Sequence, residues 1–379
     1  MADCDVPDQD LKTNMMDDSP QKLERELDRI IEACTECGNC VRQCQYLRQY
    51  GTPRALAEAF KAGILAVETI YSCNLCRLCN VVCPERLEPS GLFHLMRCSM
   101  VADGRAPLRQ HRRMLTYERI GLSRIYELYV IPENCTAVFF PGCALAGSRP
   151  EQTLRLFSMM RTDIPDLGVV LSCCAKPSRD LGRTGFFNTV IDRLLDRLKH
   201  RGVHSIITAC PSCQSVLSEH GSGFDVKTIY HVLAGGTPAA EPAAPAAVAI
   251  HDPCATRFDT DLHKITRSIV SAAGLDIKEM KYKGKRTLCC GEGGSACYVD
   301  AAITDSWAEK RAEEAAGLPV LTYCAGCVEF FSKRFETIHI IDLLLHPQRA
   351  MTGAAKISKS PMTYVNRLMV KLKMKRLAG

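Results

Sequence analysis

Eighteen of the 22 cysteines of this 379-residue chain fall into four clusters, and the clusters are two motifs that each occur twice. The first motif is Cys-x2-Cys-x2-Cys-x3-Cys, and its copies are Cys34, Cys37, Cys40, Cys44 and Cys73, Cys76, Cys79, Cys83. The second motif has a lone cysteine, an adjacent pair and a Cys-x2-Cys, and its copies are Cys143, Cys173, Cys174, Cys210, Cys213 and Cys254, Cys289, Cys290, Cys324, Cys327. Such spacings predict metal ligation rather than a disulfide framework.

The spacing of the first motif is typical of the bacterial ferredoxin run that binds 4Fe-4S clusters. Each run supplies three thiolates to one cubane, and in two-cluster ferredoxins the fourth thiolate comes from the other run. We therefore assign one cubane to Cys34, Cys37, Cys40 and Cys83, and the other to Cys73, Cys76, Cys79 and Cys44. A pair of zinc sites is the alternative, but zinc requires only two Cys-x2-Cys hooks.

Length and composition bound the remaining possibilities. A chain with 46% hydrophobic residues is long enough for two or three packed domains. We find no secretory signal and no apolar run that could span a bilayer, so the sequence predicts a cytoplasmic protein. The formal charge of +6 is mild and gathers at the C-terminus, which gives little support to nucleic-acid binding.

The expected architecture is a multidomain α+β protein. Helices are predicted over 21–33, 53–62 and 91–103, around the ferredoxin runs. From residue 133, apolar strand-like runs alternate with helices, which indicates parallel α/β domains, and this pattern occurs twice. The expected segments are a disordered start over 1–20, an α-helical ferredoxin domain over 21–132, two Rossmann-like cysteine-rich domains over 133–236 and 248–350, a Pro/Ala linker over 237–247 and a basic tail over 351–379.

Each cysteine element of the second motif follows a strand-like run, one of which is expected at 286–288. Ligands collect beyond the carboxyl ends of strands in open parallel sheets, so five cysteines are expected to converge in each repeat. Five thiolates exceed the needs of one cubane, so one of them is free or bridges two irons. After the second pair, the glycines would let the backbone approach a cluster closely; they are Gly291, Gly293 and Gly294.

These repeats resemble the cysteine-rich CCG domains of heterodisulfide reductase. Two ferredoxin runs followed by two such domains is the order found in its D subunit, and in the iron-sulfur subunits of glycolate and lactate oxidases. The resemblance implies that each five-cysteine set can hold a noncubane 4Fe-4S cluster with one bridging cysteine, and that two facing clusters split a disulfide. The implied metal ligands are Cys143, Cys173, Cys174, Cys210, Cys213, Cys254, Cys289, Cys290, Cys324 and Cys327, and the implied catalytic cysteines are the last five.

Several residues near these motifs leave alternatives open. The first pair is followed by Ala175 where the family has glycine, so the first site could hold zinc or another cluster. Lys176 could place a cation near a thiolate, but we favour a solvated lysine before a turn. His251 and Asp252 could supply a proton to a thiolate product, although we favour a role in orienting the turn. The other cysteines are predicted to be unligated; they are Cys4, Cys98, Cys135 and Cys297.

The sequence favours an electron-transfer oxidoreductase subunit in which cubanes pass electrons to noncubane clusters that reduce a disulfide or thiol substrate. One alternative is a relay for a flavoprotein dehydrogenase, with a quinone or membrane cytochrome as the other partner. Another is a non-catalytic scaffold with metal-stapled folds. A disulfide-reducing site needs an open pocket between the two five-cysteine clusters, whereas a relay can be covered by protein.

The C-terminal tail is basic, with no acidic residue after Ala354. Val365, Leu368, Met369 and Leu372 fall at helical spacing, so the tail could dock on a membrane subunit or an anionic lipid surface. The alternative is a terminal helix that packs on its own domain.

Overall fold

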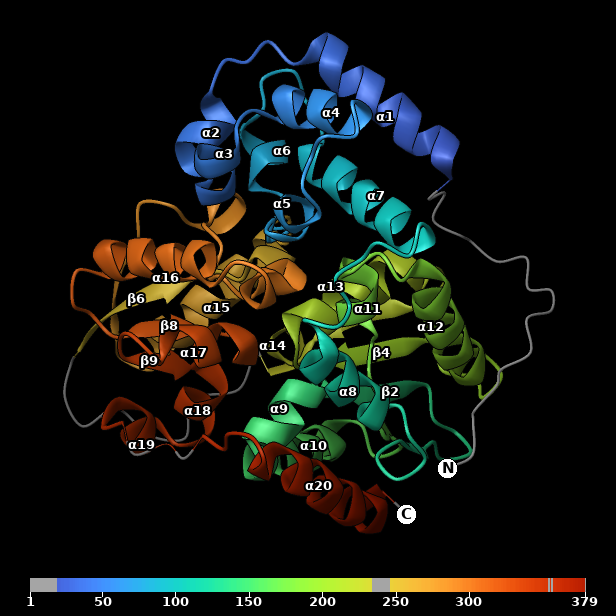
Figure 1. Ribbon diagram of the computed structural model, residues 1–379. Coiled ribbons are helices and arrows are strands. Elements are labelled where there is room, and N and C mark those ends of the chain that lie inside the picture. The colour runs from blue at the N-terminus through green and yellow to red at the C-terminus, as the bar shows by residue number, and fades with distance from the viewer. Residues whose placement is uncertain (1–18, 234–245, 354, 356, 379) are drawn as a thin grey trace.

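The computed structural model describes residues 19–233, 246–353, 355 and 357–378 (Figure 1). Nearly all of the segments 1–20 and 237–247, and with them Cys4, lie outside these residues. Figure 1 shows the N-terminal helices lying above two neighbouring α/β regions, with the C-terminal helix below.

The N-terminal region is helical, and among the described residues no strand precedes Leu128. The three predicted helices are confirmed to within two residues. Two of them begin with a side-chain cap followed by proline, because Ser19 and Thr52 accept hydrogen bonds from the first turns. The helices are α1 Pro20–Ala33, α2 Asn39–Gln43, α3 Gln45–Tyr50, α4 Pro53–Lys61, α5 Val67–Tyr71, α6 Leu78–Val82, α7 Pro89–Ala102 and α8 Arg112–Gly121.

The first sheet has the strand order β1-β3-β2-β4-β5, and only β1 runs antiparallel to its neighbour. Every residue of β2 and β3 is buried, as expected for central strands covered on both faces. The strands are β1 Leu128–Val130, β2 Ala137–Phe140, β3 Gly168–Leu171, β4 Ser205–Thr208 and β5 Asp225–Thr228. The expected domain start at residue 133 leaves β1 outside the domain whose sheet it joins. The sequence did not predict β1, because a three-residue edge strand is too short to show a periodic pattern.

The second sheet has the order β7-β6-β8-β9 and is parallel throughout. Its strands are β6 Ala247–His251, β7 Asp276–Lys278, β8 Val320–Thr322 and β9 Thr337–His339. The run predicted at 286–288 is wrong: a 3-10 turn, η2, covers Gly284–Arg286, and β7 pairs with β6 instead. Two parallel sheets among many helices agree with the expected mixed α/β class, and the finer Rossmann-like assignment stays a prediction.

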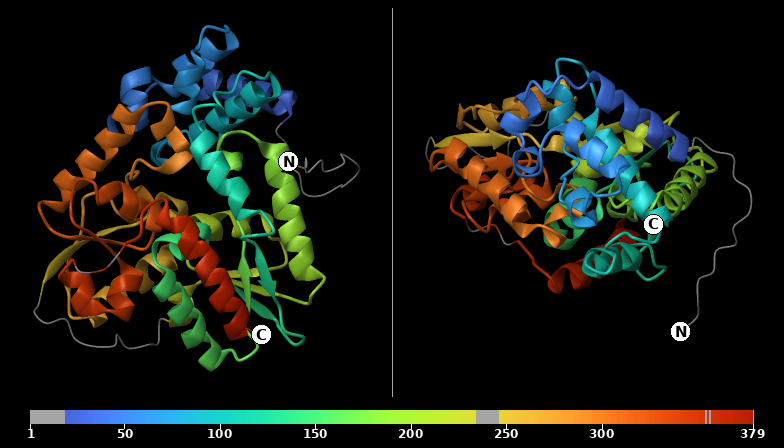
Figure 2. Two further views of the ribbon diagram at one scale, coloured as in Figure 1. Left: turned by 60° about the horizontal axis from the view of Figure 1, so that its bottom comes forward. Right: turned by 45° about the horizontal axis from the view of Figure 1, so that its top comes forward.

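Helices cover both sheets, and one hydrophobic core extends from the first sheet into the second, joining residues such as Phe139 and Ile250. The two sheets lie side by side under the N-terminal helices (Figure 2). The remaining helices are α9 Cys143–Ser148, α10 Pro150–Asp163, α11 Lys176–Asp180, α12 Thr184–Lys199, α13 Pro211–His220, α14 Ile229–Leu233, η1 Cys254–Thr256, α15 Thr260–Ala272, η3 Gly293–Tyr298, α16 Ala301–Ala315, α17 Ala325–Phe331, α18 Ile340–Leu345, α19 Pro347–Met351 and α20 Met362–Ala378.

The C-terminal helix α20 packs on α9 and α10 of the first α/β region (Figure 2). Its buried residues are Asn366, Arg367, Val370, Met374 and Ala378. The apolar stripe predicted from the sequence is on another face, since Val365 and Leu372 remain 56% and 57% exposed. In the part of the chain that the structure describes, no helix combines the length and apolarity that crossing a membrane requires.

Candidate iron-sulfur sites

The eight cysteines of the ferredoxin runs gather into two groups of four. One cavity is lined by Cys34, Cys37, Cys40 and Cys83, and we call it the outer cubane site. A second cavity is lined by Cys44, Cys73, Cys76 and Cys79, and we call it the inner cubane site. Each group contains three cysteines of one run and the last cysteine of the other, which is the arrangement that exchange of the fourth ligand requires.

The two cubane sites differ in burial. Cys37 of the outer site is exposed, and its three companions are half-buried. All four cysteines of the inner site are buried. Burial raises the pKa of Cys44 well above the ordinary thiol value, and the neighbouring charges of Cys76 and Cys73 raise it further. The outer site therefore faces the surface, while the inner site lies in a dry interior.

Left-handed residues wrap both runs in the same way. Between the first two cysteines, Glu36 and Leu75 both have φ of +51°. Directly after the second cysteine, Gly38 and Arg77 have φ of +73° and +63°. The left-handed conformation costs a non-glycine residue free energy. Because this conformation recurs at matching positions of the two runs, we infer that the site determines the backbone shape there.

The first five-cysteine site lies at the carboxyl ends of β2, β3 and β4. Cys143 begins α9, Cys173 and Cys174 follow β3, and Cys210 precedes α13, which carries Cys213. The Sγ atoms of Cys213 and Cys174 are 3.5 Å apart. A hydrogen bond with Cys173 lowers the pKa of Cys143, which shows that these thiols also touch.

The second five-cysteine site repeats this layout. Cys254 lies in η1, and Cys324 precedes α17 with φ −122° and ψ 120°, which nearly equal the −121° and 120° of Cys210 before α13. Hydrogen bonds join Cys289 to Cys254 and Cys290. Further hydrogen bonds join Cys327 to Cys290 and Cys324, so the five thiols form one connected group.

The residues that follow the two cysteine pairs both have positive φ, although only the second is a glycine. Ala175 follows the first pair with φ of +51°, and Gly291 follows the second pair with φ of +104°. Both residues are buried. The alanine thus adopts the left-handed conformation that favours glycine, at some cost in strain.

The glycines after the second pair lie where the loop packs closely on neighbouring backbone, and their approach to a cluster stays a prediction. A Cβ at Gly293 would lie 2.6 Å from the Asn74 carbonyl oxygen, and one at Gly294 would lie 2.5 Å from that of Cys73. A Cβ at Gly291 would meet the Thr304 carbonyl oxygen at 2.5 Å. The glycines therefore allow the loop to pack against the inner cubane run and against α16, since no side chain fits there.

The inner cubane site and the second five-cysteine site share a boundary. The thiols of Cys76 and Cys289 are close neighbours, and Cys289 lowers the pKa of Cys76. Arg257 Nε donates to the Cys76 carbonyl oxygen at 2.9 Å, and Asn74 Nδ2 donates to that of Gly291 at 2.9 Å. The contact brings cysteines of two predicted clusters together.

Sequence reasoning missed the polar residues at this boundary. Arg97 is fully buried and donates to the carbonyl oxygens of Cys73, Asp180 and Gly294. It therefore links the helical region to both α/β regions. The sequence signal that could have identified Arg97 is that it is a lone arginine within the apolar run of α7. Trp307, the only tryptophan, lines the inner cubane site.

Comparison with known proteins identifies the domains. Residues 33–88 match the 4Fe-4S dicluster domain, and residues 137–218 and 248–332 each match the cysteine-rich domain. The chain joins a 4Fe-4S dicluster domain to two cysteine-rich domains. The dicluster domain confirms iron-sulfur cluster binding as the role of the ferredoxin runs.

Three relatives illustrate the range of proteins that this chain resembles. The D subunit of dihydromethanophenazine:CoB--CoM heterodisulfide reductase from Methanosarcina acetivorans is 24% identical over 75% of this chain and 83% of its own length. The B subunit of fumarate reductase (CoM/CoB) from Methanothermobacter marburgensis is 26% identical over 78% of this chain and 66% of its own. EtfAB:quinone oxidoreductase from Syntrophomonas wolfei is 24% identical over 65% of this chain, which covers 40% of that relative. The resemblance to the D subunit of heterodisulfide reductase is confirmed.

The two cysteine-rich domains turn their cysteine sites toward each other. Elements of the two sites pack together, α13 on η1 and α11 on η3. A hydrogen bond with Cys327 lowers the pKa of Cys324, but burial and the charges of Glu292 and Cys210 outweigh it and raise that pKa. The charge of Cys210, from the first site, is thus felt in the second.

Lys176 is not the solvated lysine that we favoured. Its side chain is 24% exposed and forms an ion pair with Asp180 one helical turn later. Burial lowers the pKa of Lys176, but the charge and hydrogen bond of Asp180 outweigh burial and raise it. The charge of Cys254, from the second site, adds to this rise.

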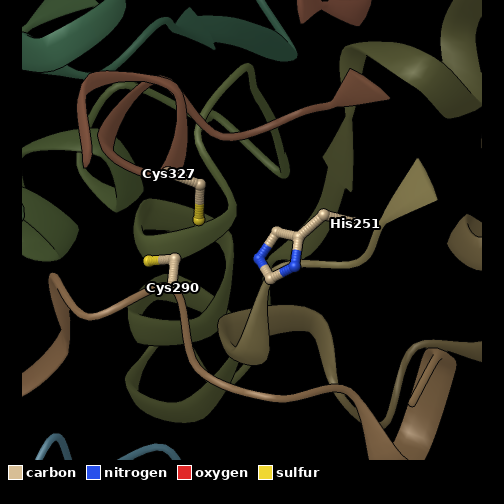
Figure 3. Close-up of side chains that lie close together, drawn as sticks. All are labelled: His251, Cys290 and Cys327. Atoms are coloured by element: carbon tan, nitrogen blue, oxygen red, sulfur yellow. The ribbon is translucent and has the colours of Figure 1, made fainter. Parts of the chain in front are cut away.

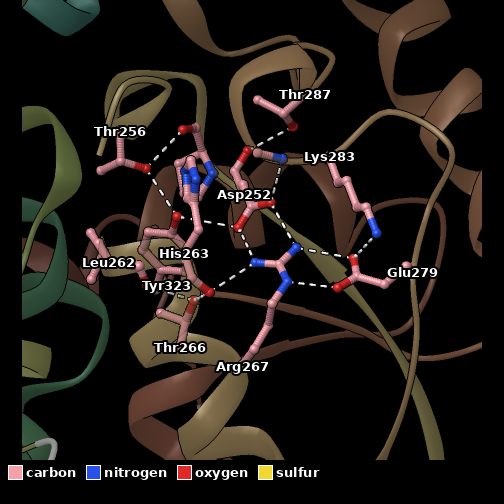
Figure 4. Close-up of polar contacts among 12 residues, drawn as sticks. Asp252, Thr256, Leu262, His263, Thr266, Arg267, Glu279, Lys283, Thr287 and Tyr323 are labelled. Carbon is pink, nitrogen blue, oxygen red and sulfur yellow. Dashed lines mark hydrogen bonds and ion pairs between the residues drawn. The ribbon is translucent and has the colours of Figure 1, made fainter. Parts of the chain in front are cut away.

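Asp252 is held as an anion in a structural network of the second cysteine-rich domain (Figure 4). Its carboxylate accepts two hydrogen bonds of 3.0 Å from Arg267 and one of 2.7 Å from the Gly284 backbone nitrogen. Burial alone would raise the pKa of Asp252, but Arg267 holds it below its ordinary value. The Asp252 carbonyl oxygen also accepts from Thr287 Oγ1 at 2.8 Å. The network orients the turn before Cys254, as favoured, and ties it to the segment before Cys289.

His251, the neighbour of Asp252, lies beside the cysteines of the second site. Figure 3 shows its imidazole next to the side chains of Cys290 and Cys327. Burial, together with Arg311 and Arg257, lowers the pKa of His251 well below its ordinary value.

The described cysteines outside the motifs have separate surroundings. Cys98 is within hydrogen-bonding distance of His94, and Cys135 donates to the Ala137 carbonyl oxygen at 3.0 Å. Cys297 is half-buried in η3, where burial raises its pKa to about 11. The prediction that these three are unligated stays a prediction.

Proposed function

We propose that this chain carries electrons from two 4Fe-4S cubanes to noncubane clusters in its cysteine-rich domains, where a disulfide is reduced to two thiols. The proximity of the Cys76 and Cys289 thiols is the observation that carries the proposal, because Cys289 is the largest influence on the pKa of Cys76. A cysteine assigned to the inner cubane is thus a neighbour of one assigned to the second noncubane cluster. Electron transfer between these centres therefore needs no intervening group.

Burial supports an order for the electron path. The outer cubane site reaches the surface at Cys37, so a donor subunit can dock there. Cys79 of the inner site feels the charge of Cys40 of the outer site, so the two cubane sites are close neighbours. The path then leads through Cys289 to the second five-cysteine site, which faces the first.

The donor sets fit the proposed groups. Each cubane site offers four cysteines, and each five-cysteine site offers one thiolate more than a cubane needs, which suits a cluster with a bridging cysteine. In the second site, Cys254, Cys289, Cys290, Cys324 and Cys327 are the proposed catalytic set. A disulfide consumes two electrons and two protons to give two thiols, and the clusters supply these electrons one at a time.

The partners are proposed from the relatives. Two relatives are named as subunits, of a heterodisulfide reductase and a fumarate reductase. We infer that this chain also works within a complex, with a flavoprotein or a membrane cytochrome as electron donor. A cytoplasmic location, peripheral to the membrane, fits such a complex.

A relay to a quinone is the second candidate. Seven of the ten cysteines in the two five-cysteine sites are buried, and only Cys143, Cys210 and Cys254 are half-buried. A relay tolerates such cover, whereas disulfide reduction requires access for a substrate. One relative is named as an EtfAB:quinone oxidoreductase.

Thiol addition separates the two candidates. Added to the oxidised protein, a substrate thiol is expected to produce a new paramagnetic signal, and Cys290→Ala is expected to abolish it while both cubane signals remain. Cys98→Ala is the matched control, since it removes a buried cysteine outside the motifs. No response of either noncubane spectrum to any thiol or disulfide, with turnover still driven by a flavoprotein, would leave only the relay.

Iron analysis tests the cofactor content and excludes a bare scaffold. Four filled sites correspond to about 16 irons per chain. About 12 irons would indicate that the first five-cysteine site holds zinc or another cluster. A protein purified without oxygen that still lacks iron and sulfide would refute both redox candidates.

A further inference from the structure

His251 has no hydrogen-bond partner although it is completely buried. The residue ends β6, and neither Nδ1 nor Nε2 is bonded within the described part of the chain. An imidazole carries at least one N–H donor in either protonation state. Burying such a donor unpaired costs free energy, so this position favours a partner that the protein atoms alone do not supply.

The surroundings of the ring identify that partner. One ring nitrogen and the Sγ atoms of Cys290 and Cys327 lie within 4.8 Å of one another. In Figure 3, one ring nitrogen is on the side of these two cysteines. The Phe331 ring packs edge-on against the imidazole, with centroids 4.8 Å apart at 83°, and fixes its orientation. A group bonded to both sulfurs would therefore lie within reach of the imidazole.

The corresponding strand-end position of the first five-cysteine site carries no nitrogen. His251 stands three residues before Cys254, and Phe140 stands three residues before Cys143. Both residues end the strand that leads into their site, and both are completely buried. The two repeats thus place a nitrogen donor at one site and a hydrocarbon ring at the other.

We propose that His251 donates a hydrogen bond to a sulfur of the iron-sulfur group in the second site, and that this bond raises the reduction potential of that site. The inference rests on the proposed function, because it requires a cluster at the second site. Hydrogen bonds to cluster sulfurs stabilise the added negative charge of the reduced state. With five thiolates already present, the imidazole is a positioning and tuning residue rather than an iron ligand.

His251→Phe tests the proposal, because it gives the second site the residue of the first. Removing one charge-assisted hydrogen bond is expected to lower the reduction equilibrium constant of the second site about tenfold, a shift of about 59 mV for one electron. EPR-monitored redox titration of the holoprotein measures it. Iron and sulfide content should stay constant, and His251→Gln, which keeps an N–H donor, should shift the potential less. His339→Phe is the control, since His339 is another fully buried histidine of this domain and caps α18.

Three results would overturn the proposal. An unchanged potential in His251→Phe would show that no such hydrogen bond exists. Loss of iron from the second site in that variant, or a strong nitrogen hyperfine coupling in the wild type, would make His251 an iron ligand instead. A wild type without iron at the second site would refute the proposed function as well, so the two failures are distinguishable.

Discussion

Asp252 shows how a single carboxylate positions two ligand segments. Its side chain binds Arg267 and the backbone of Gly284, while its carbonyl oxygen binds Thr287. The turn that leads to Cys254 and the segment that leads to Cys289 are thereby held together. The position of these two cysteines depends on an anion that is not itself a ligand.

Replacement of Asp252 by asparagine is expected to lower the free energy of unfolding by about 2 kcal/mol. The loss is smaller than for a fully buried pair, because Arg267 is 22% exposed and keeps Glu279 as a partner. Urea unfolding measures it. Asp261→Asn is the control and should change little, since its pair with Lys264 is more than three-quarters exposed. Equal effects of the two variants would contradict a structural role for Asp252.

Cys44 belongs to the first run but lies in the cavity of the second. Cys44→Ala is therefore expected to remove the signal of the inner cubane and about four irons, and to spare the outer cubane. EPR of the reduced variant reads out both cubanes separately. Cys83→Ala is the reciprocal variant and should remove the outer cubane instead. Loss of the outer signal in Cys44→Ala would show that the runs do not exchange ligands.

At the scale of elements, α20 changes how the C-terminal tail is understood. It packs on α9, whose first residue is Cys143, and its Arg367 lies beside the cavity that contains Cys143 and Ser172. The tail is thus part of the wall of the first five-cysteine site. Its removal is expected to disturb that site, and any membrane docking uses only the face that α20 leaves exposed.

Truncation of the packed face of α20 should be costly. Met374 is completely buried, so Met374→Ala is expected to lower the free energy of unfolding by about 2 kcal/mol, through lost burial and a cavity. Leu372→Ala removes a side chain of similar size that is 57% exposed, and should cost less than about 0.5 kcal/mol. Thermal or urea unfolding compares the two. A larger loss for Leu372→Ala would mean that α20 packs through the predicted stripe.

The elements that sequence could predict are those with strong local signals. Helices α1 and α4 have capping residues and proline at their starts, and β2 is a continuous apolar run. The short edge strand β1 and the segment 286–288 gave no reliable signal, because tertiary contacts shape them. The packed face of α20 was mistaken because Asn366 and Arg367 are buried there. Asn366 donates to the Gly147 carbonyl oxygen at 2.8 Å, a contact that no local pattern reveals.

For the whole molecule, a buried ion pair joins the two cysteine-rich domains. Arg149 Nε is 2.7 Å from Asp342 Oδ2, and the two side chains are 1% and 3% exposed. Gln152 also donates to this carboxylate, at 3.2 Å. The pair fixes how the domains face each other, and therefore the distance between the two five-cysteine sites.

Asp342→Ala leaves the Arg149 cation buried without its partner, and is expected to lower the free energy of unfolding by about 3 to 5 kcal/mol. Asp276→Ala is the control, because its pair with Lys278 is exposed on both sides. Chemical unfolding measures the difference. Any magnetic interaction between groups bound at the two five-cysteine sites should also weaken in Asp342→Ala. A change no greater than that of the control would show that the interface does not depend on this pair.

The cysteines of each candidate site could be predicted from the sequence, whereas most of the residues that surround them could not. Spacing places cysteines on one loop or one helix turn, so the groups of four and five could be predicted. The contact of Cys76 with Cys289, and the bonds of Arg97 to the two cysteine-rich domains, join residues more than 80 positions apart. Such contacts depend on how domains dock, which a single sequence does not display.

The packing of Gly294 and Trp307 on the inner cubane run also bears on how the protein matures. A ribosome adds roughly 5 to 20 residues per second, so Trp307 emerges roughly 10 to 50 seconds after Cys79. During that interval the inner site lacks the wall that the second cysteine-rich domain provides. The inner site is therefore open to iron and sulfide while the chain is being synthesised, and it is covered once the second cysteine-rich domain has folded.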